Sequence, residues 1–83
     1  VVYINFVLDK RFRAIVSDGY DVDTVIKNIS LVDPNLKFVP GETVIIFDEI
    51  QEYPDVATCL KSFNIDRRFD IICSGSMLGI NSK

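Results

Sequence analysis

The sequence predicts an α/β fold built on a parallel sheet, and three observations lead to this prediction. Three short apolar segments, rich in β-branched residues, have the character of strands buried on both faces. Segments with apolar residues at helical spacing separate them. The chain has 83 residues, of which 48% are hydrophobic, which suits one small packed domain. Strands that alternate with helices imply right-handed crossovers and a partial sheet of about three parallel strands.

The strands are predicted at residues 1–6 (VVYINF), 43–48 (TVIIFD) and 69–74 (FDIICS). Each combines β-branched and aromatic residues in a run too short for a helix. Because the carboxyl ends of parallel strands meet at one edge of a sheet, ligands bind there in such folds. The residues that end these strands are therefore the first candidates for a functional site.

The clearest predicted helix covers residues 21–32, whose apolar residues recur on one face. Asp21 or Asp23 can cap its free N–H groups. A second helix is predicted at residues 10–18, where apolar residues again have helical spacing. A third begins at Pro54, because a proline in the first helical turn lacks only an N–H that would be unpaired anyway. Residues 64–68 are predicted as a loop.

Composition argues against several classes of function. The net charge is −3 and the adjacent pair Arg67–Arg68 lies among acids, which gives no basic surface for nucleic acid. No apolar run approaches the roughly 20 residues that span a bilayer, and no secretory signal is visible. Cys59 and Cys73 lack metal-ligand spacing, so we expect free thiols in a reducing compartment and a cytoplasmic location.

Two adjacent acids, Asp48 and Glu49, follow the apolar residues of the second predicted strand. An unpaired buried carboxylate is costly, so acids at this place need a reason. In P-loop enzymes the first acid holds the magnesium ion that bridges the nucleotide phosphates, and the next one can polarise the attacking water. Neighbouring strand residues point to opposite faces, which would let the pair divide these tasks. The alternative is that Asp48 begins a polar loop and Glu49 is simply exposed.

The third predicted strand ends in Ser74, Gly75 and Ser76. P-loop ATPases of this kind place a polar sensor at the end of the strand beside the acidic one, where it contacts the γ-phosphate or the attacking water. The alternative is that Gly75 supplies a turn and the serines bind turn backbone groups. Both interpretations stay open on the residues alone.

Beyond these patterns, FVPGETVIIFDEIQEYP, LKSF and IICSGSMLG resemble the prokaryotic AAA-type P-loop ATPases that carry a C-terminal domain of unknown function. Members of that family read "pgkTLIfFDEIQ", then a helix, then a strand ending "GSlLG". Their preceding strand, "YINFE", is similar to VVYINF at residues 1–6. The resemblance covers nearly the whole chain, and residues 48–51 with residues 75–79 are its most specific part.

The resemblance implies a partial three-layer P-loop NTPase-type sheet in which the second strand lies between the other two. It implies ATP and Mg²⁺ as cofactors, with Asp48 binding the ion through its water shell and Glu49 as the catalytic base. It implies that Ser74 or Ser76 is the sensor and leaves that choice open. Gln51 belongs to the matched motif near the γ-phosphate, without an assigned role. Asn5, at the end of the first strand, is predicted to cap a loop.

The phosphate-binding motif G-x-x-x-x-G-K-[ST] does not occur in the sequence. In the resembled family it lies upstream of the VVYINF-like strand. We therefore expect residues 1–83 to be a fragment of an AAA-type ATPase core that spans the Walker B and sensor 1 region and lacks the Walker A strand and loop. The parent would hydrolyse ATP with magnesium and the fragment alone would not. The missing strand would expose an apolar edge at residues 69–74 and favour self-association.

Two other classes remain as rivals. One is a non-catalytic α/β interaction module whose acidic strand end is solvated surface. The other is a phospho-acceptor domain of the receiver type, which expects an acidic pair after its first strand. Here that strand ends in Asn5 and Phe6, so the receiver class ranks below the other two.

Overall fold

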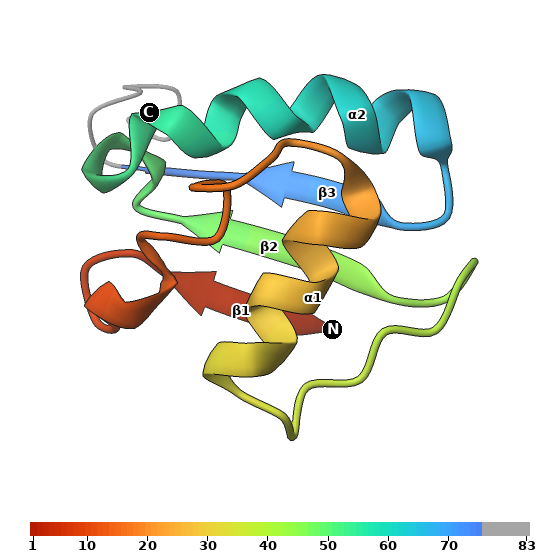
Figure 1. The fold of residues 1–83 in the computed structure, drawn as a ribbon, viewed down its shortest axis with the longest axis horizontal. Helices are drawn as coiled ribbons and strands as arrows, with labels where there is room; N and C mark the ends of the chain where they lie inside the picture. The colour runs from red at the N-terminus through yellow and green to blue at the C-terminus, as the bar shows by residue number, and fades with distance from the viewer. Residues whose placement is uncertain (76–83) are drawn as a thin grey trace.

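The structure is a computed structural model, and it describes residues 1–75. Three strands, β1 (Val2–Asn5), β2 (Val44–Asp48) and β3 (Asp70–Cys73), form one parallel sheet in the order β1-β2-β3 (Figure 1). Ile45 of β2 is in register with Val2 of β1 and with Ile71 of β3. The parallel α/β fold predicted from the sequence is confirmed, and so is the central place of the second strand.

Helix α1 (Val22–Val32) connects β1 to β2, and helix α2 (Cys59–Asp66) connects β2 to β3 (Figure 1). Of the two predicted caps, Asp21 is the one that caps α1, because its side chain accepts a hydrogen bond from the Thr24 N–H at 3.1 Å, whereas Asp23 lies within the first turn. The strand order advances steadily across the sheet, so right-handed crossovers bring both helices to the same face. Within residues 1–75 the fold therefore comprises two of the layers of the predicted three-layer class.

The core lies between the sheet and these helices. Ile4 of β1 and Phe47 of β2 are fully buried on the face toward the helices. On the other face, Tyr3 is 51% exposed and Ile72 is 53% exposed. The expectation that the strands are buried on both faces is wrong for residues 1–75, since both crossover helices cover one face.

An aromatic cluster fills the core near the carboxyl ends of the strands. The ring of Phe6 lies 5.5 Å from that of Phe47 and 5.4 Å from that of Tyr53, measured between centroids. Tyr53 follows a short 3₁₀ helix, η2 (Ile50–Glu52), and its hydroxyl accepts a hydrogen bond from the Val16 N–H at 3.0 Å. The cluster thus ties the segment after β2 to the segment after β1, and both border the site described below.

One predicted helix and one predicted helix end are wrong. Residues 10–18 do not form an α-helix: a 3₁₀ helix, η1 (Lys10–Phe12), is followed by turns closed by i→i+3 bonds. The apolar residues of that segment are nevertheless buried, so their spacing indicated burial correctly but not the helix type. At the other end, residues 64–66 belong to α2 rather than to a loop. The helix ends at Arg67, whose left-handed backbone (φ 68°) is a common helix stop.

A 3₁₀ helix, η3 (Pro54–Thr58), precedes α2 and begins at Pro54, where a helix start was predicted. In the part of the chain that the structure describes, no helix combines the length and the apolar character needed to cross a bilayer.

Candidate functional site

The carboxyl ends of the three strands bring the predicted polar residues together. Asp48 ends β2 and is in register with Asn5, which ends β1. Ser74 follows β3, and its N–H donates to the Phe47 carbonyl at 2.9 Å, which extends the parallel ladder by one residue. Asp48 and Ser74 therefore lie side by side, and the Ser74 hydroxyl donates to Asp48 Oδ1 at 2.9 Å.

Within residues 1–75, three donors reach the Asp48 carboxylate. The Tyr3 hydroxyl donates to Oδ2, while the Ser74 hydroxyl and the Glu49 N–H, at 2.8 Å, donate to Oδ1. The hydrogen bond from Tyr3, followed by that from Ser74, lowers the pKa of the Asp48 carboxyl below its ordinary value. In return, the bond to Asp48 raises the pKa of the Tyr3 hydroxyl. Asp48 is thus an ionised carboxylate at neutral pH.

Tyr3 is a residue of this cluster that the sequence interpretation missed. It lies two residues before Asn5 on β1, so both side chains stand on the same face of the sheet. Asn5 Nδ2 donates to the Tyr3 hydroxyl at 3.1 Å. Asn5 Oδ1 accepts from the Val7 and Leu8 N–H groups at 2.9 and 3.0 Å, which bears out its predicted role as a loop cap. The sequence did carry a signal for Tyr3: residues two apart on a strand share a face, so Tyr3 lies on the same face as Asn5.

Glu49 leaves the strand through an unusual backbone conformation. Its φ is 58° and its ψ is 47°, in the left-handed region that non-glycine residues seldom adopt. Arg67 shares this conformation but ends a helix, where it is ordinary. Glu49 follows a strand, and strained residues of this kind gather at functional sites. Glu49 lies beyond β2, so the left-handed turn, and not the alternation of strand residues, separates its side chain from that of Asp48. The division of tasks between the two acids stays a prediction.

Gln51 makes a short contact with this acid: its Nε2 donates to Glu49 Oε1 at 2.6 Å. The segment is also joined to the third strand, since the Ile50 N–H donates to the Ser74 carbonyl at 3.1 Å. Residues 48–51 and residues 74–75, which the sequence interpretation singled out, are thus neighbours. Ser76 and residues 77–79, the rest of the second motif, lie outside the described residues. The sensor role of Ser74 or Ser76 stays a prediction, and the choice between them stays open.

A protein family model described as an AAA domain matches residues 1–83. The chain belongs to this AAA domain family. No curated protein and no solved structure gave a match. The family match covers the three strands and both Asp48 and Glu49. The site described above therefore belongs to an AAA-type, ATPase-like domain.

The residues of this AAA domain fit a magnesium ion of the kind that keeps most of its water. Mg²⁺ is commonly held by one or two carboxylates together with waters and substrate phosphates, not by a cage of protein ligands. The residues in the described range include no cluster of three or more His, Cys, Asp or Glu. A carboxylate has about four lone-pair sites. Among the described residues, two donors bind Oδ1 and one binds Oδ2, so Oδ2 can accept from a further donor such as a metal-bound water.

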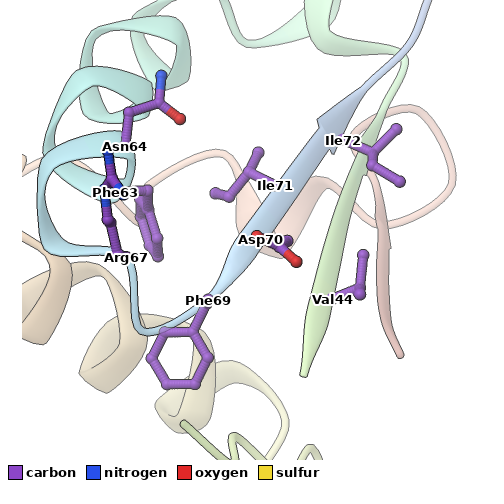
Figure 2. Close-up of a pocket in the computed structure, with 8 residues that line it drawn as sticks. All are labelled: Val44, Phe63, Asn64, Arg67, Phe69, Asp70, Ile71 and Ile72. Atoms are coloured by element: carbon purple, nitrogen blue, oxygen red, sulfur yellow. The ribbon is translucent and has the colours of Figure 1, made fainter. Parts of the chain in front are cut away.

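One hollow of this AAA domain lies away from Asp48 and Glu49. It is a groove of about 810 Å³ along the outer edge of β3 (Figure 2). Its lining comes from β3, from the end of α2 and from the start of β2: Val44, Phe63, Asn64, Arg67, Phe69, Asp70, Ile71 and Ile72. Neither Asp48 nor Glu49 lines the groove, so the groove and the Asp48 cluster are separate features.

Proposed function

We propose that this chain supplies the magnesium-holding and water-activating part, the Walker B segment, of an AAA-type ATPase site. The observation that supports it most is the Asp48 carboxylate, which ends the central strand and accepts hydrogen bonds from Tyr3 and Ser74 that lower its pKa further. A metal ligand has to be deprotonated, and a catalytic centre at a strand end agrees with the general rule for parallel sheets. The AAA family match points to the same chemistry.

The proposed roles follow the geometry. Asp48 holds the ion through its water shell, and the bound Mg²⁺ neutralises charge on the phosphates of ATP. Glu49, adjacent in sequence and turned away by its left-handed backbone, is the base that orients the attacking water. Ser74, whose hydroxyl already reaches Asp48, or Ser76 is the sensor of the γ-phosphate.

The phosphate cradle of the site is proposed to lie outside these residues, because the sequence contains no G-x-x-x-x-G-K-[ST] motif. The longer protein would be cytoplasmic and carry the C-terminal domain of the resembled family. The backbone N–H groups and the lysine of the G-x-x-x-x-G-K-[ST] motif bind the phosphates tightly. We therefore expect the 83-residue chain to hydrolyse no ATP above background.

The experiment compares ATP hydrolysis by the 83-residue chain and by the full-length gene product, each with and without Mg²⁺. The proposal predicts magnesium-dependent turnover by the longer protein alone and its loss in the Asp48→Ala variant. Turnover by the short chain, or an active Asp48→Ala protein, would contradict it. The alternative of a non-catalytic interaction module predicts no turnover in any sample.

Self-association through the edge of β3 is a second part of the proposal. Among the described residues β3 pairs only with β2, so its outer edge presents unpaired backbone groups. Figure 2 shows Ile71 and Ile72 on this edge, beside the groove that the end of α2 borders. A second copy of the chain, adding its own β3, is the occupant that we propose for the isolated 83-residue chain.

A further inference from the structure

Gly75 is placed where the backbone does not require a glycine. The glycines with positive φ in residues 1–75 are Gly19 and Gly41, so Gly75 has a conformation open to other residues. A turn that needs glycine, which was the simplest interpretation from the sequence, does not explain this position. Its surroundings do: a Cβ at residue 75 would overlap Gln51 Oε1 and would lie 3.3 Å from the Ile50 nitrogen.

The Gln51 side chain is held between this glycine and the Glu49 carboxylate. A carboxylate can only accept, which fixes the amide with Nε2 toward Glu49, at 2.6 Å from its Oε1. The other end, Oε1, is buried and accepts no hydrogen bond within residues 1–75. The side chain keeps this place although one of its polar atoms is unsatisfied there, so the charged contact to Glu49 is the interaction that directs it.

A flexible glutamate needs such a contact if it is to act as a base. The left-handed backbone of Glu49 fixes where the side chain begins, but several torsions remain between the Cα and the carboxylate. A short hydrogen bond to a charged acceptor is about twice as strong as a neutral one and removes much of that freedom. Misplacing a catalytic group by about 1 Å can lower a rate by roughly a hundredfold.

We propose that Gln51 is a positioning residue for Glu49, and that residue 75 is glycine because any side chain there displaces the Gln51 amide. The inference rests on the proposed role of Glu49 as the catalytic base. Gln51, before α2, and Gly75, after it, both belong to the matched motifs and together position Glu49. In this arrangement Gly75 acts on Glu49 only through Gln51.

That claim is tested by a double-mutant cycle on the 83-residue chain without ATP or metal. The variants are Gln51→Ala, Gly75→Ala and the double variant, with Gln51→Asn as the conservative change that is one methylene shorter. The readouts are the ¹³C chemical shift of the Glu49 carboxyl carbon and the hydrogen exchange of the Gln51 side-chain amide. Backbone amide spectra show whether each variant is folded.

The proposal predicts that Gln51→Ala and Gly75→Ala move the Glu49 signal alike, and that the double variant equals Gln51→Ala alone. It also predicts faster exchange of the Gln51 amide in Gly75→Ala. Additive effects, or a Glu49 signal unchanged by Gln51→Ala, would overturn it. If Gly75→Ala does not fold, Gln51→Ala and Gln51→Asn still decide, because both must move the Glu49 signal.

The catalytic consequence is read in the full-length ATPase. Gln51→Ala is expected to lower kcat about tenfold or more and to change KM for ATP by no more than about twofold, since Gln51 acts on the base and not on nucleotide binding. Wild-type kcat in Gln51→Ala would refute the positioning role. A wild-type protein without any turnover would instead refute the proposed function, and the positioning role with it, while the coupling in the short chain would still be measured.

Discussion

The hydroxyl of Tyr3 on β1 donates a hydrogen bond to Oδ2 of Asp48 on β2. From the other side, the Ser74 hydroxyl at the end of β3 donates to Oδ1 of the same carboxylate. The central strand of the sheet thus ends in an acid bound from both neighbouring strands. Within residues 1–75 the side chains that donate to this carboxylate are two neutral hydroxyls, which lower its pKa and leave its negative charge available to a cation.

Replacing Tyr3 with phenylalanine is expected to raise the pKa of the Asp48 carboxyl toward its ordinary value of 3.8, because the Tyr3 hydrogen bond is the main cause of the lowering. The pKa is measured by ¹³C NMR of the Asp48 carboxyl carbon across an acid titration. Tyr20→Phe removes a phenol from the loop before α1 and serves as the control, with no change expected at Asp48. An unchanged Asp48 pKa in Tyr3→Phe would show that the hydroxyl does not bind there.

The lowered pKa values also predict a loss of stability in acid. A carboxyl group whose pKa is lower in the folded chain contributes stability above its unfolded pKa, near 3.8, and loses it as the pH falls through the folded value. Asp9, Asp21 and Asp66 are shifted in the same direction, mainly by hydrogen bonds from Arg11, Thr24 and Arg68 respectively. Urea unfolding is measured at pH 7 and at successively lower pH. The urea concentration at which half of the chain is unfolded is expected to decrease once the pH is lowered below about 3.8. A midpoint that is constant over this range would contradict these shifts.

The aromatic core sets the stability of the sheet. Phe47→Ala is expected to destabilise the chain by about 3–5 kcal/mol, because the fully buried ring leaves a cavity against Phe6. A domain of this size has little stability to spare, so the variant should be largely unfolded. The control is Ile72→Ala on the open face, 53% exposed, for which a much smaller loss of unfolding free energy is expected. Equal losses in urea titrations of the two variants would refute the assignment of the core to the helix-covered face.

The outer edge of β3 is expected to drive association of the isolated chain. Light scattering on a size-exclusion column should show a species larger than the 9.4 kDa monomer. Ile72→Lys should return it to the monomer, because a charge on an edge strand opposes pairing with a second strand. Ile65→Lys, at a 75% exposed position on α2, is the matched control and should leave the larger species intact. A monomeric wild-type chain would count against this edge as an interface.

The residues alone were sufficient to predict the three strands, because each is a short apolar run rich in β-branched residues. The geometry of parallel sheets then predicted that the polar residues ending the strands gather at one edge. The order of the strands was predicted only from the family resemblance. The left-handed backbone of Glu49 could not be predicted, because a glutamate seldom adopts this conformation and its residue type does not indicate it. Nor did the sequence predict the contact between Gln51 and Gly75, which the fold creates across some 24 residues of chain.

The helix predicted at residues 10–18 failed for a related reason. Apolar residues at positions 12, 15 and 16 fit a helix and a run of 3₁₀ turns equally well, and both bury them. The Asp9 side chain accepts from the Arg11 N–H at 3.0 Å and starts the 3₁₀ turn η1. Local side-chain bonds of this kind compete with the α-helix and decide the outcome where periodicity cannot.

The central claim, that Glu49 is the base of an AAA-type ATPase site, is tested most directly by ATP turnover in the full-length protein carrying Glu49→Gln. The matched control is Glu52→Gln, an acid three residues further on that pairs with Arg13 at 3.4 Å. We predict that Glu49→Gln still binds ATP but turns it over at least about a hundredfold more slowly, as expected when a general base is lost, whereas Glu52→Gln stays near the wild-type rate. Wild-type turnover in Glu49→Gln would contradict the account.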